Sequence, residues 1–333
     1  MEIKSAFKNI QKDLLCNLGV PKSMLRFMRF SGQPALLIFT YHRVCRSLDD
    51  YGYLNIPVNI FEQHMKFLKD NFKTVAMADA LEEFHNNRAE GIYAAVNFDD
   101  GYMDNYLQAY PVLKRYGIPA TIFLTTDFIG REHAFWWDKV FNMLYLSDAG
   151  ELKIDIDKKR LAFRLGGIFE REKAGNRINS ILAAKDQQSI ESFIKKFENK
   201  FSRSEKPRTS MMLGWDEIKA MHKHGISFGS HTKSHRNLCL LRDQDLAEEL
   251  AGSKKDIEKM LGVEIAEFAY PFGILDQRVK AFVKEAGYKY ARTTSKGFNY
   301  KNTDRYMLSA IGTGSFLKAD HLALRIMSCF LNR

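Results

Sequence analysis

Strand-length apolar runs alternate with amphipathic segments of helical length along most of this chain, and this alternation limits its possible folds more than any other feature. Such alternation is typical of βα units wound around a parallel sheet. With 333 residues and 45% apolar content, the chain can bury a large core. The expected strands are residues 35–40, 93–98, 120–125, 226–229, 264–270, 288–293 and 306–311. The expected helices are residues 61–71, 78–85, 106–116, 215–224, 246–261 and 276–286.

Residues 131–213 interrupt the alternation. Phe135-Trp136-Trp137-Asp138 opens a helical stretch, a charged and weakly patterned section follows, and residues 189–201 are amphipathic. We predict a mostly helical insertion that caps or flanks the functional site; a peripheral helical patch is the alternative. The predicted organisation is a basic amphipathic segment at 1–33, a first barrel part at 34–130, the insertion at 131–213, a second barrel part at 214–315 and an amphipathic tail at 316–333.

Two adjacent carboxylates, Asp99 and Asp100, follow the expected strand 93–98 and precede Gly101. Adjacent side chains on an extended strand face opposite ways, so a turn at Gly101 is needed before both carboxylates can serve one site. Asp-Asp-Gly is also a common structural turn.

His231 and His235 follow the short expected strand 226–229. On one turn of helix, this spacing puts both imidazoles on the same face. One aspartate with two histidines makes a three-ligand site that leaves a divalent cation an open position for water. The other aspartate is then free to act as a base, although buried or solvated histidines are also common without any ligand.

These segments together resemble the NodB-homology polysaccharide deacetylases, carbohydrate esterase family 4. The family's first motif, typically Thr-Phe-Asp-Asp-Gly, stands here as Asn97-Phe98-Asp99-Asp100-Gly101, and its second, His-Ser/Thr-x-x-His, as His231-Thr232-Lys233-Ser234-His235. Its third, Arg-x-Pro-Tyr-Gly in many members, is partly matched by Ala269-Tyr270-Pro271-Phe272-Gly273. The resemblance runs from about Pro34 to Ser315. It implies a distorted (β/α)7 barrel, whose active site would lie beyond the carboxyl ends of its strands.

The resemblance also implies roles. Asp100, His231 and His235 would hold the metal; zinc suits this set best, and cobalt, nickel or iron could replace it. Asp99 would be the general base, unless it merely caps the next helix. The backbone N–H of Phe272 would stabilise the oxyanion.

A sugar could stack on the aromatic rings near these motifs. Tyr270, Pro271 and Trp215 are the predicted substrate-binding residues, and core packing is the alternative for each ring.

Two positions depart from the family pattern. The arginine of the third motif, which orients the base, is replaced by Ala269, so another cation or backbone donors must take its place. The late histidine that usually acts as general acid is missing from Ile311-Gly312-Thr313-Gly314, and His321 lies in the tail. His42, at the end of the first expected strand, is the predicted substitute.

The net charge of +10 is concentrated near the N-terminus, where residues 1–46 carry eight Lys and Arg against two acids. Interleaved apolar residues make this segment suited to an anionic membrane surface, or alternatively to packing on the barrel with a solvated basic side. No binding motif supports a nucleic-acid partner. Lysines interrupt any signal-peptide core, no apolar run reaches membrane-spanning length, and the four cysteines lie far apart. We therefore expect a cytoplasmic location, with peripheral contact at the inner leaflet if the basic segment binds the membrane.

The predicted function is metal-dependent N-deacetylation of N-acetylated amino sugars of the N-acetylglucosamine type, in a polysaccharide or a lipid-linked oligosaccharide precursor. An O-acetyl esterase or other amidohydrolase of the same fold is one alternative. A degenerate, metal-containing glycan-binding protein is another, because the arginine and the late histidine are missing. The sequence does not predict an oligomeric state.

Overall fold

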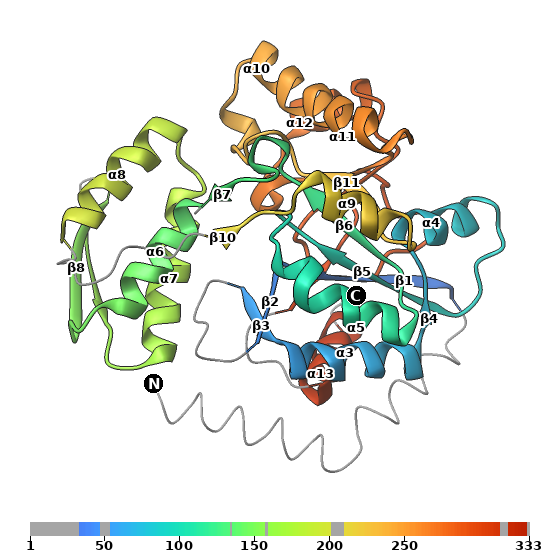
Figure 1. Ribbon diagram of the computed structural model, residues 1–333, viewed down its shortest axis with the longest axis horizontal. Helices are drawn as coiled ribbons and strands as arrows, with labels where there is room; N and C mark the ends of the chain where they lie inside the picture. The colour runs from blue at the N-terminus through green and yellow to red at the C-terminus, as the bar shows by residue number, and fades with distance from the viewer. Residues whose placement is uncertain are drawn as a thin grey trace.

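A computed structural model of the protein describes residues 33–46, 54–133, 135–156, 159–200, 210–313 and 319–331. The principal strands are β1 (Ala35–Tyr41), β4 (Lys73–Thr74), β5 (Ile92–Phe98), β6 (Ala120–Leu124), β11 (Ser227–Ser230), β12 (Glu267–Ala269), β13 (Tyr290–Arg292) and β14 (Ile311–Gly312). The sheet runs β13-β12-β11-β6-β5-β1-β14 with all neighbours parallel, and β4 adds to the side of β5. Figure 1 shows β11, β6, β5 and β1 in this order.

The segment between β13 and β14 connects the two ends of this sheet. Near its end, Leu308 pairs with β13: Leu308 N donates to Ala291 O at 3.0 Å, and Leu308 O accepts from Thr293 N at 2.8 Å. Directly after β14 the chain reaches β1, where Thr313 N donates to Thr40 O at 2.9 Å. The predicted distorted (β/α)7 barrel is therefore confirmed. Of the strand expected at 306–311, only Ile311 belongs to a strand of the sheet, β14, because the preceding residues cross from one edge of the sheet to the other.

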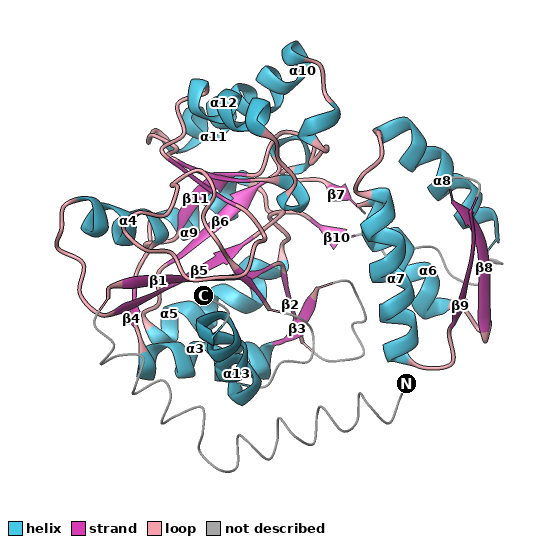
Figure 2. Ribbon diagram, turned by 180° about the vertical axis from the view of Figure 1, so that it is seen from behind, coloured by secondary structure: helices cyan, strands magenta, loops and turns pink. Residues whose placement is uncertain are grey.

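The helices follow the strands as the alternation predicted, and most of them cover the outside of the sheet (Figure 2). Residues that alternate along β1 separate into two cores: Leu37 and Phe39 pack toward the outer helices, whereas Leu36 and Ile38 pack inside the barrel. Each fully buried side chain of this kind stabilises the fold by about 1.5–3 kcal/mol.

The helices are α3 (Val58–Asn71), α4 (Met77–His85), η1 (Asn105–Ala109), α5 (Tyr110–Tyr116), α9 (Trp215–His222), α10 (Asp243–Ala247), η4 (Glu248–Gly252), α11 (Ser253–Leu261), α12 (Gln277–Glu285) and α13 (Ala319–Leu331). Short 3₁₀ turns occur at η2 (Thr126–Phe128), η3 (Leu238–Leu240) and η5 (Pro271–Gly273), and the short strands β2 (Arg43–Cys45) and β3 (Asn55–Pro57) pair beside the barrel.

The insertion forms a lobe beside the barrel, joined to it where β7 (Glu132–His133) pairs with β10 (Ser210–Met211) (Figure 1). Its own apolar core lies between helices and a hairpin. Three helices make up most of the lobe, as predicted, but an antiparallel hairpin was not predicted. Leu152, Ile154 and Ile156 are buried alternately with exposed charged residues, the pattern of a half-buried strand. The lobe contains α6 (Trp136–Leu146), β8 (Glu151–Ile156), β9 (Lys159–Arg164), α7 (Ile168–Leu182) and α8 (Gln187–Lys200).

Two terminal predictions have different outcomes. The basic segment at 1–33 falls, apart from residue 33, outside the described residues. The tail at 316–333 contains α13, whose Leu322 and Ile326 are buried in the outer core. Among the helices of the described ranges, none combines the length and the apolar character that crossing a membrane requires.

Glu267 on β12 is a buried carboxyl group in the barrel wall. Burial raises its pKa to about 7 from an ordinary value of 4.5, and the hydroxyl of Thr121, 3.4 Å from Oε2, offsets this only in part. Because the folded-state pKa is the higher one, the folded chain holds this proton more tightly than the unfolded chain. The resulting stability is complete below about pH 4.5 and is lost as the pH rises through about 7.

We predict that Glu267→Gln stabilises the protein at alkaline pH. The difference between 7 and 4.5 is about 2.5 pKa units, equivalent to about 3 kcal/mol, which is the upper limit of the gain. Urea unfolding of both proteins at pH 5 and pH 8 measures it: the two should be similar at the lower pH and diverge at the higher. Parallel pH profiles would show that Glu267 ionises without cost.

Candidate active site at the barrel rim

Asp99 and Asp100 leave the carboxyl end of β5, as predicted. The backbone of Asp100 is left-handed, with φ 70°, and Gly101 follows with φ 79°. The turn therefore begins at Asp100 itself, which removes the strand alternation that would point the two carboxylates in opposite directions. A side chain at Gly101 would also lie 3.0 Å from Leu124, so glycine suits this position sterically as well.

His231 and His235 lie in the loop after β11, and the prediction that one helical turn aligns them was wrong. Thr232 and His235 both have positive φ, 70° and 57°, which no right-handed helix allows. The loop is held instead by side chains. Thr232 Oγ1 accepts from His235 N at 2.9 Å, and Glu249 Oε2 accepts from the backbone N–H groups of Lys233 and Ser234. The imidazoles converge because of this loop geometry.

The structure brings Asp100, His231 and His235 together as a buried triad whose ligand atoms all lie within 4.8 Å of one another. Asp100 Oδ1 is 3.4 Å from His235 Nε2 and 3.7 Å from His231 Nε2. His231 Nδ1 is 2.7 Å from the carbonyl oxygen of Ala269, which fixes the ring proton there and leaves Nε2 with its lone pair. Within the described ranges Asp100 Oδ1 has no hydrogen-bond donor. A divalent cation fits between these acceptors.

The protonation states support the same assignment. Burial lowers the pKa of His231 and lowers that of His235 well below its ordinary value, so both rings are neutral at neutral pH and able to bind a metal. Burial, reinforced by the charges of Asp99 and Asp138, raises the pKa of Asp100 well above its ordinary value. A bound cation would oppose that shift by stabilising the ionised carboxylate.

Asp99, beside the triad, is held by a different set of partners. The Arg292 guanidinium donates to its Oδ1, and His42 Nε2 lies 3.7 Å from its Oδ2. Burial alone would raise the pKa of Asp99, but the charge of Arg292, followed by those of His231 and His42, holds it below its usual range. Burial also lowers the pKa of His42 to about 4, despite the neighbouring carboxylate.

Arg292 is the cation that the sequence analysis did not find. It lies on β13 directly opposite Ala269 in the β12–β13 register, so the guanidinium reaches Asp99 from the strand next to the one expected. Arg292 is 1% exposed and its guanidinium lies over the ring of Phe123, 4.8 Å from the centroid. In the sequence, the available signal for this role was an arginine within a strand expected to be buried. The register of β12 and β13 is needed to show that its guanidinium faces Asp99.

Aromatic rings enclose His235. The ring centroids of Trp137 and Phe272 lie 4.5 and 4.6 Å from that of His235. Trp137 belongs to α6, so the insertion contributes directly to the surroundings of the triad. Trp137 Nε1 donates to the hydroxyl of Tyr102 at 3.2 Å, and that hydroxyl donates to Asp138 at 2.8 Å. From the sequence, Phe135-Trp136-Trp137-Asp138 was expected to start a helix of an insertion that caps or flanks the site, but none of the four was predicted as a site residue.

The remaining predicted residues are only partly at the site. Pro271 and Phe272 form η5, where Phe272 has φ 58° and presents its ring to His235. Tyr270 is 1% exposed and its hydroxyl donates to Tyr306 O, so it packs in the outer core and the prediction that it binds substrate was wrong. Trp215 begins α9 and packs against the same core, so it does not line the cavities beside the triad.

The fold and the site define a class of protein: a parallel βα barrel that gathers two aspartates and two histidines at its rim. Residues 86–291 match the family model described as polysaccharide deacetylase, which spans more than half of the chain. The chain belongs to this family, whose hydrolases act on N-acetyl amide bonds.

Relatives and solved structures agree with that assignment. The chain is 26% identical over 282 residues to YxkH of Bacillus subtilis, a protein assigned to the polysaccharide deacetylases, and this covers 84% of the chain and 72% of YxkH. It is 32% identical over 113 residues to the poly-beta-1,6-N-acetyl-D-glucosamine N-deacetylase of Staphylococcus aureus, covering 29% of the chain but 38% of that enzyme. The Streptococcus pyogenes deacetylase PplD, solved with acetate, shares the fold with a TM-score of 0.59 at 17% identity, covering 88% of this chain and 99% of PplD.

We predict that His235→Ala abolishes tight metal binding without unfolding the barrel, because the ligand lies on a rim loop rather than in a strand. Elemental analysis after purification from metal-supplemented growth should find about one divalent ion per wild-type chain and far less in the variant. Phe169→Ala, at an exposed position of α7, is the control that should keep the ion. Wild-type protein without stoichiometric metal would contradict the assignment.

Proposed function

We propose that this protein is a metal-dependent N-deacetylase that removes acetyl groups from N-acetylated amino sugars of the N-acetylglucosamine type in a glycan. The observation that carries the proposal is the pairing of two adjacent carboxylates with different partners. Asp100 faces two imidazole nitrogens, whereas Asp99 faces Arg292 and His42. One carboxylate is thus suited to hold a cation and the other to accept a proton.

Asp100, His231 and His235 would hold the ion, which when bound supplies Lewis-acid polarisation of the amide carbonyl and activation of water. Asp99 accepts the proton of the attacking water, with Arg292 fixing the orientation of its carboxylate. The backbone N–H of Phe272 donates to the oxyanion that forms on the substrate carbonyl.

Collapse of the tetrahedral species breaks the C–N bond, and the leaving nitrogen must gain a proton. We assign this step to His42, because its Nε2 lies 3.7 Å from Asp99 Oδ2. The lowered pKa keeps His42 neutral at rest, so the proton it delivers is the one that Asp99 removed from water. Water and amide are thereby converted to acetate and a free amine.

The substrate class is supported by the family and by one relative. The Staphylococcus aureus relative is named for poly-beta-1,6-N-acetyl-D-glucosamine, although the match covers a minor part of that enzyme. A polysaccharide or its lipid-linked precursor is the substrate we propose. Detection of free amines in the product separates this activity from an O-acetyl esterase.

The decisive prediction contrasts the two neighbouring aspartates. Asp99→Asn keeps the size of the side chain and the three metal ligands but removes the proton acceptor, so metal should stay bound while deacetylation falls by about 10²–10⁴-fold. Asp100→Asn should reduce both metal content and turnover. Acetate release from N-acetylglucosamine oligomers, measured with metal content, tests this. Full activity of Asp99→Asn would refute its role as base, and binding of such oligomers by the wild type without acetate release would indicate a binding protein.

A second prediction concerns the relocated arginine. Arg292→Ala should retain the ion but lower the turnover number by about 10- to 100-fold, because Asp99 loses the donor that orients it. Because Ala269 and Arg292 are register partners, the double variant Arg292→Ala/Ala269→Arg returns a guanidinium to the neighbouring strand, in the space vacated by the first change. Partial recovery of turnover is expected.

Circular dichroism provides the folding control for Arg292→Ala and for the double variant. A purely structural role of Arg292 predicts a loss of folded protein with normal turnover in the folded fraction. Undiminished turnover of Arg292→Ala would overturn the assignment.

A further inference from the structure

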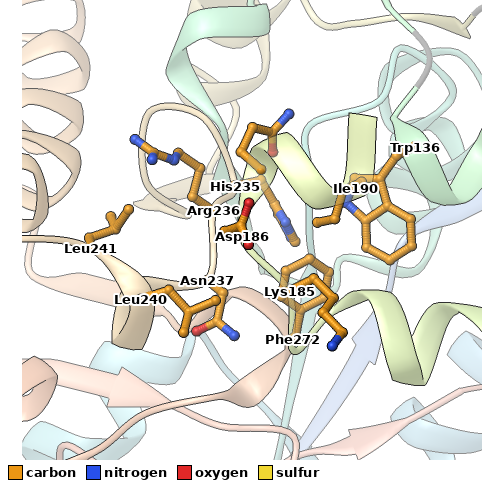
Figure 3. A pocket seen from close by; sticks show the side chains of 11 residues that line it. Trp136, Lys185, Asp186, Ile190, His235, Arg236, Asn237, Leu240, Leu241 and Phe272 are labelled. Carbon is orange, nitrogen blue, oxygen red and sulfur yellow. The ribbon is translucent and has the colours of Figure 1, made fainter. Parts of the chain in front are cut away.

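A cleft lies between the insertion lobe and the barrel, next to the triad. Its volume is about 440 Å³, within the range typical of ligand sites, and His235 of the triad is one of its lining residues. A smaller hollow adjoins it and shares Trp136, Gln187, Ile190 and His235 with it (Figure 3). We call the larger space the lobe cleft; it is lined by Phe128, Phe135, Trp136, Trp137, Lys139, Gln187, Ile190, Glu191, Ile194, Lys195, Glu198, Ser234 and His235.

The two sides of the lobe cleft differ in chemistry. The barrel side and the start of α6 contribute aromatic rings, of which Trp136 is partly exposed. α8 contributes Ile190 and Ile194, which are buried, and also Gln187, Glu191 and Lys195, which recur every four residues and are exposed. Residues at this spacing share one face of a helix. Aromatic rings and a row of amide, carboxylate and ammonium groups therefore line the same cleft.

This pairing matches the two faces of a sugar ring. Pyranose C–H faces pack on aromatic rings, while their hydroxyl and acetamido groups need hydrogen-bond donors and acceptors. The charges balance, because Lys139 and Lys195 oppose Glu191 and Glu198, and Lys139 Nζ lies 3.5 Å from Glu198 Oε1. A cleft without net charge suits an uncharged N-acetylated glycan better than a polyanion.

The cleft is also elongated. From Gln187 to Glu198 is 11 residues of α8, or about 16 Å at 1.5 Å per residue. A single sugar bound at the triad would leave this length unfilled. Since His235 both belongs to the triad and lines the cleft, a glycan chain that continues from the reacting sugar can enter the cleft directly.

We propose that the lobe cleft binds the sugar residues next to the one that is deacetylated, with Trp136 as the stacking platform and α8 as the hydrogen-bonding wall. The substrate is then an oligosaccharide or polysaccharide rather than a monosaccharide. This inference rests on the proposed deacetylase function and assigns the insertion a role in substrate length selection.

Equilibrium binding tests the proposal in the Asp99→Asn background, where turnover does not consume the ligand. The probes are N-acetylglucosamine and its β-1,6-linked di- and tetrasaccharides. The tetrasaccharide should bind at least about tenfold more tightly than the monosaccharide. Adding Trp136→Ala, or Gln187→Ala with Glu191→Ala, should remove most of this gain. Phe169→Ala, which removes an exposed ring from α7 of the same lobe, should leave it intact.

The outcomes separate the two hypotheses. Affinity that does not rise with chain length, or a gain that survives Trp136→Ala and the α8 double change, overturns the cleft assignment. An alkyl glycoside of N-acetylglucosamine that matches the tetrasaccharide would assign the cleft to a lipid tail and also overturn it. If the length dependence holds but wild-type protein releases no acetate from any oligomer, the cleft stands and the deacetylase function fails.

Discussion

The requirement to balance two adjacent buried negative charges organises the functional end of this barrel. Asp99 and Asp100 are 4% and 2% exposed, and each would be costly to ionise without a compensating charge. The protein supplies the guanidinium of Arg292 for Asp99. For Asp100 it supplies two neutral imidazoles, which can share a cation but cannot replace one. The different partners suit two chemically identical side chains to the different tasks that we propose for them.

The backbone around these residues has unusual φ angles, which bring the charged and metal-binding side chains together. Six non-glycine residues in the described ranges have positive φ, and four of them (Asp100, Thr232, His235 and Phe272) lie at or between the site residues. Such conformations cost on the order of 1–3 kcal/mol each and persist only where the surrounding structure imposes them. Here the Glu249 carboxylate and the Thr232 hydroxyl hold the histidine loop, and the barrel core provides the stability that offsets the strain.

The insertion participates in the site through contacts rather than through catalytic groups. Trp137 packs on His235 and, with Asp138, holds the Tyr102 hydroxyl two residues beyond Asp100. The first turn of α6 thus braces both a histidine and the turn that carries the aspartates. Displacement of the lobe would disturb the triad, so the lobe cleft and the proposed metal site are mechanically connected.

The sequence by itself determined the barrel, because strand and helix periodicities and strand-end polar residues are local patterns. It also identified the residues of the triad and the base that we propose, since Asp-Asp-Gly and His-x-x-x-His carry those side chains within short segments. Only the tertiary structure decided the rest. Arg292 replaces the expected arginine through strand register, and Tyr270 faces the core because of which face of the sheet it occupies. The histidines converge through a left-handed loop instead of a helix. Register, sheet face and loop conformation depend on partners distant in the chain, so no local pattern reports them.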